Sequence, residues 1–95
     1  MTRDLLSADE VAAALRDLPQ WSGDTTALRR TVKCASFRAA VSLVDDVANV
    51  AEELDHHPDI DVRYDTVTFV SSTHSAGGVT AYDVELAKRI DGLAG

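Results

Sequence analysis

One uninterrupted helical pattern occupies the middle of the chain and limits what the remainder can fold into. Between positions 37 and 54 apolar residues recur at steps of three and four, and the segment contains no glycine or proline. This spacing predicts an amphipathic helix whose apolar stripe must be covered by another element. The stripe consists of Phe37, Ala40, Val41, Val44, Val47, Ala48, Ala51 and Leu54. A chain of 95 residues builds one hydrophobic core, so we expect a single domain over residues 1–95.

The segments on either side of this helix alternate apolar and polar residues, as half-buried strands do. Residues 26–34 show this alternation before the helix, and residues 60–65 and 67–73 show it after the helix. A hairpin is the simplest way to join the last two segments. Capping signals predict two further helices, over residues 8–18 and from Thr80 to Leu93.

We expect one further strand before the central helix, so the order of elements is α-β-β-α-β-β-α, which indicates an α+β fold. We expect a four-stranded antiparallel sheet with three helices packed on one face. Its other face and its edges then stay open. In the central helix, Leu43 and Val50 lie outside the main stripe and are either extra core or a subunit contact. Because so small a core buries a modest share of the chain's surface, we expect a homo-oligomer, either a dimer or a tetramer.

The charge of the chain excludes some classes of partner. Its 16 Asp and Glu residues outnumber its 9 Lys and Arg residues, which gives a net charge of −7. An acidic surface repels polyphosphates and anionic lipids, so we expect no direct nucleic-acid partner and no membrane association. No apolar run approaches the roughly 18 residues of a transmembrane helix. A single cysteine and the lack of an apolar signal segment favour a cytoplasmic location.

Three histidines, His56, His57 and His74, lie next to loops rather than in the apolar stripes. If the hairpin turns through residues 65–66, His57 lies opposite His74; a turn one residue earlier places position 55 there instead. Either register keeps His74 near the adjacent pair. Imidazoles titrate near about 6.5, so such a cluster can hold both acid and base forms at neutral pH. This favours acid–base catalysis of the addition or loss of water.

The same residue types also occur in two other kinds of site. Three imidazoles could hold a catalytic zinc ion, but adjacent histidines point apart in an extended chain and no His-x-x-x-His spacing is present. A serine nucleophile would need a Gly-x-Ser-x-Gly turn, which the sequence lacks. Cys34 lies in a strand pattern and is expected to be a small buried residue. We therefore expect neither a metal ion nor covalent catalysis.

A longer pattern connects these histidines to their neighbours. The run Glu-x-x-x-His-His-Pro spans residues 52–58, and His74 follows His57 by seventeen positions. Asp83 then lies in a Thr-x-x-Asp-Val-x-Leu-Ala helix. Together these residues resemble the pterin-4a-carbinolamine dehydratase family, over most of the chain from Trp21 to the last helix.

The resemblance implies an activity and a set of site residues. The activity is dehydration of 4a-hydroxytetrahydropterin to quinonoid dihydropterin, without a metal or other cofactor. The residues that match the family's catalytic set are His56, His57 and His74, and those that match its supporting pocket residues are Glu52, Asp83 and Trp21. Each supporting residue also has a structural interpretation: Asp83 as a plain helix cap, Glu52 as an exposed charge and Trp21 as a buried core indole.

The family also implies an alternative function. Some of its members act as partners of a homeodomain transcription factor, and related degenerate domains act as assembly factors. A non-catalytic protein-binding module on the same fold is therefore the second hypothesis, and the intact histidine set favours the enzyme. The sequence departs from the family at Asp55, where Asn is frequent, and at Val32 and Cys34, where aromatic residues are frequent.

Overall fold

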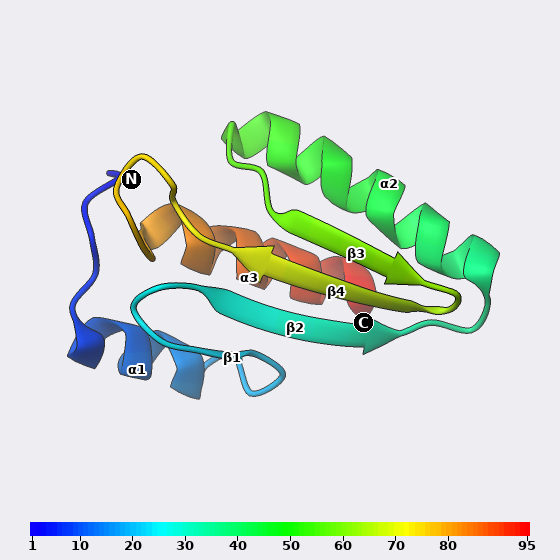
Figure 1. The fold of residues 1–95 in the computed structure, drawn as a ribbon, viewed down its shortest axis with the longest axis horizontal. Coiled ribbons are helices and arrows are strands. Elements are labelled where there is room, and N and C mark those ends of the chain that lie inside the picture. Colours follow the sequence, from blue (N-terminus) through cyan, green and yellow to red (C-terminus); the bar gives the residue numbers. More distant parts are fainter.

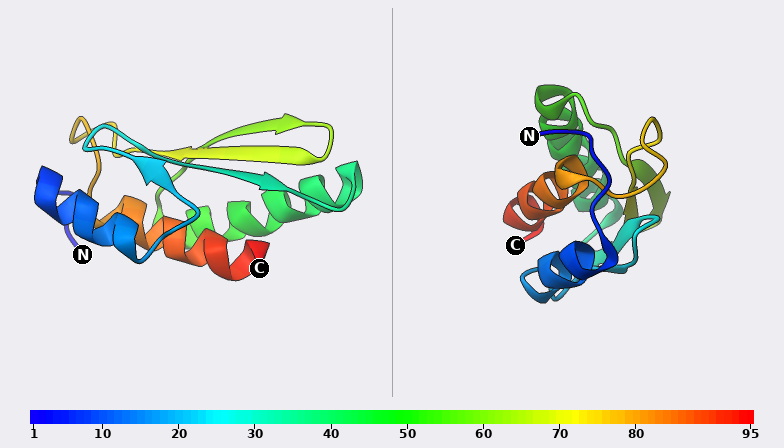
Figure 2. Two further views of the ribbon diagram at one scale, coloured as in Figure 1. Left: turned by 90° about the horizontal axis from the view of Figure 1, so that it is seen from below. Right: turned by 90° about the vertical axis from the view of Figure 1, so that its left-hand side faces the viewer.

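Three helices cover one face of a four-stranded antiparallel sheet in the computed structural model, which describes residues 1–95 (Figures 1 and 2). The strands lie in the order β1-β2-β4-β3, so β4 is central and β3 is an edge. The elements are α1 (Ala8–Arg16), β1 (Ser22–Gly23), β2 (Leu28–Lys33), α2 (Phe37–Leu54), β3 (Asp59–Arg63), β4 (Thr66–Ser71) and α3 (Ala81–Ala94). The predicted α+β fold and order of elements are confirmed.

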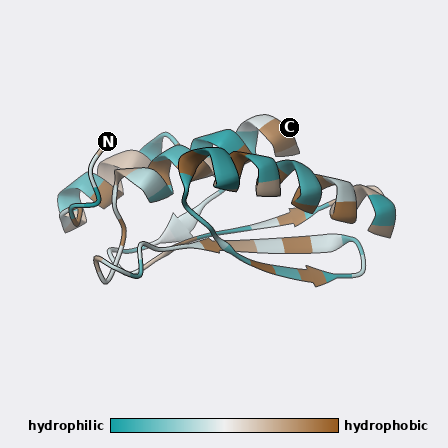
Figure 3. Cartoon of the chain, turned by 90° about the horizontal axis from the view of Figure 1, so that it is seen from above, coloured by the Kyte–Doolittle hydropathy of each residue, from teal (hydrophilic) through white to brown (hydrophobic).

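The core lies between the sheet and the helices. Figure 3 shows apolar and polar residues alternating along the strands, as the period of a pleated strand requires. The largest fully buried apolar side chains are Phe69, Leu18, Leu28, Leu86, Ile90, Val47, Val67 and Val79. No helix is both long enough and apolar enough to cross a membrane.

The β3–β4 hairpin has the second of the two registers considered. Arg63 pairs with Thr66, so the turn runs through Tyr64 and Asp65, and the expectation of a turn through residues 65–66 is wrong. The reason lies in the neighbouring strand β2. The Cys34 backbone N–H donates to the Asp65 carbonyl at 2.7 Å, and the Lys33 ammonium donates to its carboxylate. This hydrogen bond from Lys33 lowers the pKa of the Asp65 carboxyl.

The start of β2 also differs from the prediction. The strand begins at Leu28 rather than at residue 26, because the segment before it is a side-chain-stabilised turn. The Asp24 carboxylate accepts from the Thr26 backbone N–H at 2.8 Å and from the Thr26 hydroxyl. These bonds lower the pKa of Asp24 and bend the chain away from the extended pairing of a strand.

The packing of α2 settles the position of its extra apolar residues. Leu43 and Val50 are buried, so of the two alternatives the first is confirmed: they are extra core residues and not an exposed subunit contact. The uncovered residues belong instead to the predicted main stripe: Phe37 is 55% exposed and Val41 is 47% exposed. A surface hollow of about 510 Å³ runs along this side of α2, lined by Phe37, Arg38, Val41, Ser42, Val44, Asp45 and Ala48.

Candidate functional site

Five of the six predicted site residues lie where α2 and β4 end and α3 begins, towards the left of Figure 1. Glu52 belongs to the last turn of α2, and His56 and His57 follow that helix. His74 lies in the loop after β4, and Asp83 is the third residue of α3. Segments far apart in the sequence therefore meet at one end of the sheet.

The fully buried carboxylate of Asp83 is the centre of this region, because it accepts four hydrogen bonds. Its Oδ1 accepts from the Ser71 hydroxyl at 2.5 Å and contacts His56 Nε2 at 2.5 Å. Its Oδ2 accepts from the Thr73 hydroxyl at 2.8 Å and from the Thr80 backbone N–H at 2.9 Å. These donors compensate the loss of water around a buried anion. Asp83 is thus both the capping residue of α3 and a partner of a histidine.

The bond to Asp83 also orients the His56 ring. An ionised carboxylate can only accept hydrogen bonds, so His56 Nε2 is the donor in this pair. Nδ1 is then the ring nitrogen that remains to gain or lose a proton. His56 is buried, and a buried imidazole held by a carboxylate keeps one tautomer and one orientation.

The turn that ends α2 sends the two neighbouring histidines to different environments. Asp55 is in the left-handed conformation, with φ 49° and ψ 46°. Its N–H donates to the Glu52 carbonyl at 3.2 Å, and the His56 N–H donates to the Ala51 carbonyl at 3.0 Å. These are the two bonds of a Schellman turn, in which Gly or Asn is the usual left-handed residue. Beyond this turn His56 is buried, whereas His57 is exposed.

His57 forms an exposed pair with Glu52. The distance between His57 Nε2 and Glu52 Oε2 is 2.8 Å, and the two side chains are 58% and 76% exposed. Glu52 is therefore an exposed helix charge that also contacts a predicted catalytic histidine. Because water screens such a pair, it adds little to stability, and the His57 ring is accessible to a ligand.

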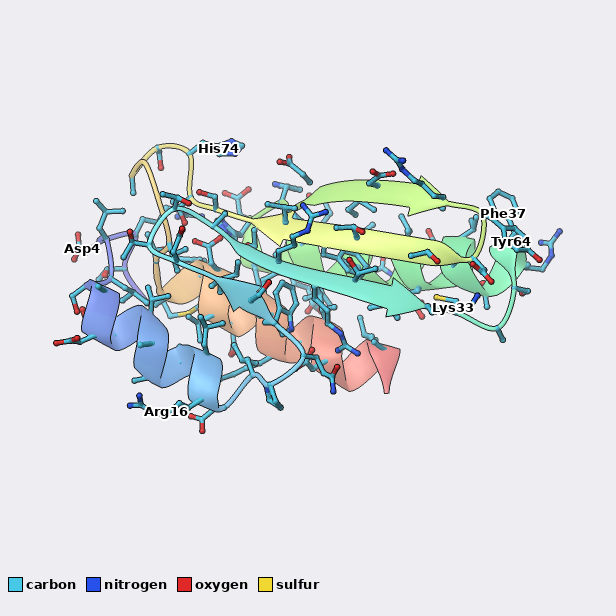
Figure 4. All side chains as sticks on the ribbon, turned by 60° about the horizontal axis from the view of Figure 1, so that its bottom comes forward. Asp4, Arg16, Lys33, Phe37, Tyr64 and His74 are labelled. Atoms are coloured by element: carbon cyan, nitrogen blue, oxygen red, sulfur yellow. The ribbon has the colours of Figure 1, made fainter.

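His74 is exposed on the loop between β4 and α3, and Figure 4 shows its side chain extending from that loop. The preceding Thr73 is buried, and its N–H donates to the Gly78 carbonyl at 2.9 Å, which closes the loop. His74 is therefore adjacent in the chain to a residue that binds Asp83. No hydrogen bond joins it to His56 or His57.

Trp21 lies away from this group. Its indole is buried in the core, and its N–H donates to the Asp91 carboxylate at 2.7 Å. Asp91 is eight residues beyond Asp83 on α3, which is about 12 Å along a helix axis. The structure therefore agrees with the interpretation of Trp21 as a core indole and does not bring it to the Asp83 region.

Three residues of the region, Ser71, Thr73 and Tyr82, are not predicted as site residues from the sequence. Ser71 and Thr73 continue the inward period of β4 beyond Phe69, so two polar residues on a buried face were a usable signal. The ring of Tyr82 lies 5.7 Å from that of His56, centroid to centroid. No local pattern indicates the contact of Tyr82, because it depends on how α3 docks against the end of α2.

The arrangement gives no support to the zinc alternative. No group of three His, Cys, Asp or Glu side chains is placed to hold a metal ion. Cys34 is partly buried and packs against the core, as expected for a small apolar residue. The site instead presents one imidazole held by a buried carboxylate next to an accessible one, which is suited to proton transfer.

Comparisons with known proteins show which family and fold the chain resembles. A sequence model of the family described as "Pterin 4 alpha carbinolamine dehydratase" matches residues 4–93. A Nocardia farcinica protein named "Putative pterin-4-alpha-carbinolamine dehydratase" is 55% identical over 94 residues, or 99% of each chain. One of the same name from Mycolicibacterium smegmatis is 52% identical over 87 residues, or 92% of this chain and 93% of that one.

Two solved structures have a similar fold. A transcriptional coactivator/pterin dehydratase from Brucella melitensis superposes with a TM-score of 0.93 at 34% identity, over 97% of this chain and 100% of that one. A pterin dehydratase-like protein identified as a RuBisCO assembly factor in the α-carboxysome gives a TM-score of 0.65 at 22% identity, over 79% of this chain and 87% of that one. The second likeness concerns the fold alone.

Proposed function

Because the chain belongs to the pterin-4a-carbinolamine dehydratase family, we propose that it dehydrates 4a-hydroxytetrahydropterin to quinonoid dihydropterin in cytoplasmic tetrahydropterin recycling. The observation that carries this proposal is the pair of neighbouring histidines in unlike environments, His56 bonded to buried Asp83 and His57 exposed beside Glu52. The proposed catalytic residues are His56, His57 and His74, and no metal ion or cofactor takes part.

The proposed reaction needs one acid and one base. The bond between C4a and the hydroxyl oxygen breaks, and an imidazolium protonates that oxygen so that it leaves as water. A neutral imidazole removes the N5 proton, and the N5–H electron pair forms the double bond between N5 and C4a. Asp83 supports this chemistry by holding the His56 ring, and Glu52 does so by orienting the His57 ring through the contact at Nε2.

The experiment that tests this proposal is a stopped-flow assay of carbinolamine dehydration, with the substrate generated in the mixing chamber. We expect dehydration to be faster than in buffer alone and equally fast after treatment with a chelator. A protein that gives no acceleration would contradict the proposal. Activity that is lost on chelation and restored by zinc would contradict its metal-free mechanism.

The second candidate is a non-catalytic protein-binding module on the same fold. It is favoured by the uncovered apolar side of α2 and by the two solved relatives described as a coactivator and as an assembly factor. The same assay separates the two candidates, since a binding module would leave the dehydration rate at that of buffer.

We also propose that the outer side of α2 joins two copies of this chain. Phe37, Val41, Val44 and Ala48, here named the outer α2 stripe, follow the alternating four- and three-residue steps of a coiled-coil seam. Arg38 and Asp45 lie seven residues apart beside this stripe, so they are on the same side of the helix.

The charges beside the stripe favour an antiparallel pair. If two α2 helices pack antiparallel about a twofold axis near Val41, Arg38 of each copy lies opposite Asp45 of the other. A parallel pair would place Arg38 beside Arg38. A second copy would therefore match the surface that the core leaves open in both apolar character and charge.

For Val41→Glu we expect dissociation to a monomer. The change places two carboxylates, one from each copy, in the apolar contact between the two α2 helices, where burying a charge is costly. Light scattering across a dilution series measures this, and the wild-type mass should exceed the 10.2 kDa of one chain. Val62→Glu on β3, a comparably exposed valine, is the control and should leave the mass unchanged. A wild-type mass of one chain, or dissociation by the control instead, would contradict the proposed interface.

A further inference from the structure

The segment that precedes α1 passes over the end of the molecule that carries the histidines. Its Leu6 backbone N–H donates to the Val79 carbonyl at 2.9 Å, which fixes the segment beside the start of α3. From there it continues towards the end of α2, as the right-hand view in Figure 2 shows. The first residues of the chain are thus close to the turn that carries His56 and His57.

Arg3 makes two contacts at this point, and both lead to the histidine turn. Its Nη2 donates to the Asp55 carbonyl at 2.8 Å. Its guanidinium carbon lies 4.1 Å from the centroid of the Tyr82 ring, and that ring in turn contacts His56 at 5.7 Å. A planar guanidinium both donates hydrogen bonds in its plane and stacks on an aromatic face.

The residue that Arg3 binds is the one whose conformation aims the histidines. Asp55 has a positive φ of 49° without being glycine, so its backbone is less favourable than that of its neighbours. The direction in which the chain leaves α2 depends on this conformation, since His56 follows directly. A hydrogen bond to the Asp55 carbonyl restrains the peptide plane that joins these two residues.

We propose that Arg3 and Tyr82 are positioning residues that together hold the Asp55–His56–His57 turn in its active geometry. Arg3 restrains the backbone of the turn through Asp55, and Tyr82 restrains the His56 ring while it supports the Arg3 guanidinium. This inference rests on the proposed dehydratase function. It adds two residues that the family pattern of histidines and carboxylates does not contain.

Arg3→Ala should lower kcat/KM of dehydration by roughly tenfold, since a small displacement of catalytic groups is costly even when its cause lies away from the chemistry. The change should act on kcat more than on KM, and Tm should stay within about 2 °C because the side chain is exposed. Arg3→Lys keeps the charge but not the planar guanidinium, so its dehydration rate should lie between those of the wild type and Arg3→Ala. The matched control is Arg16→Ala, which removes another exposed arginine, in the last turn of α1.

The readouts that establish positioning need no substrate. In Arg3→Ala, we expect faster hydrogen exchange of the His56 amide, which bonds to the Ala51 carbonyl, and shifted imidazole resonances of His56 and His57. These measurements keep the test decisive even if the wild-type protein fails to dehydrate. If exchange and resonances match those of Arg16→Ala, the proposal is wrong, and a rate loss without such changes also overturns it.

Tyr82 provides an independent arm of the test. Tyr82→Leu removes the ring and should reproduce the effects of Arg3→Ala on the rate and on the His56 resonances, whereas Tyr82→Phe keeps the ring and should restore them. Because both residues act on one turn, the double variant Arg3→Ala with Tyr82→Leu should lose less than the product of the single effects. Effects that multiply independently would contradict a shared role.

Discussion

Asp83→Ala is expected to lower the free energy of unfolding by about 3–5 kcal/mol and to remove most of the dehydration activity. The reason is that the change leaves several buried donors without an acceptor. The groups concerned are the Ser71 hydroxyl, the His56 ring N–H and the Thr80 backbone N–H, while the Thr73 hydroxyl keeps its contact with the Thr80 hydroxyl. Urea unfolding at fixed protein concentration measures the first effect, and the stopped-flow assay measures the second.

Two further variants separate the roles of this carboxylate. Asp83→Asn keeps one acceptor oxygen and the shape of the cap, so it should be more stable than Asp83→Ala while still disturbing the His56 contact. Glu85→Ala, two residues along α3, is the control, because the partly buried Glu85 side chain forms no hydrogen bond or ion pair. An Asp83→Ala variant as stable as this control would contradict the assignment of Asp83 as the centre of the buried cluster.

The double variant His56→Ala with His57→Ala is expected to lose at least about 10³-fold in dehydration rate, because general acid–base catalysis contributes roughly 10²–10⁴-fold. His57→Ala or His74→Ala alone should cost about 10²-fold or less, since a neighbouring imidazole can partly replace the missing one. Stopped-flow rates at saturating substrate measure these effects.

The histidine variants should differ in stability as well as in rate. His57→Ala removes an exposed pair and should leave Tm almost unchanged, whereas His56→Ala removes a donor from buried Asp83 and should lower it. His57→Ala is therefore the cleaner test of catalysis, and Glu52→Gln is its control for the loss of the pair alone. A double variant that retains wild-type activity would exclude these two histidines as catalytic residues.

Local signals in the sequence predicted the elements well where the signal is long or chemically specific. The unbroken stripe predicted α2 over its full length, and the capping signals predicted the starts of α1 and α3, whose N-caps are Ser7 and Thr80. The two-residue strand β1 is too short to show alternation. The register of the hairpin depends on Lys33, which belongs to β2 and lies 32 residues before its partner Asp65.

The site, like the fold, combines features that local sequence patterns predict with contacts between residues far apart in the chain. The histidine motif and the Asp83 cap are readable along the chain, but their contact requires α2, β4 and α3 to pack together. The apolar residues of α2 were visible, yet the sequence does not say which side of the helix meets the sheet. The contacts of Arg3 leave no pattern at all, because a single exposed arginine near the start of a chain is ordinary.

The contrast between the buried and the exposed part of the site affects how freely each can change by mutation. Asp83 and its donors are shared with the framework, so selection for foldability alone would preserve them. His57, Glu52 and His74 lie at the surface and carry little of the stability, so they can be replaced without loss of the fold. A chain descended from this one could therefore lose catalytic activity while it keeps its fold. This is one physical route by which the same fold can serve as an enzyme in one protein and as a protein-binding module in another.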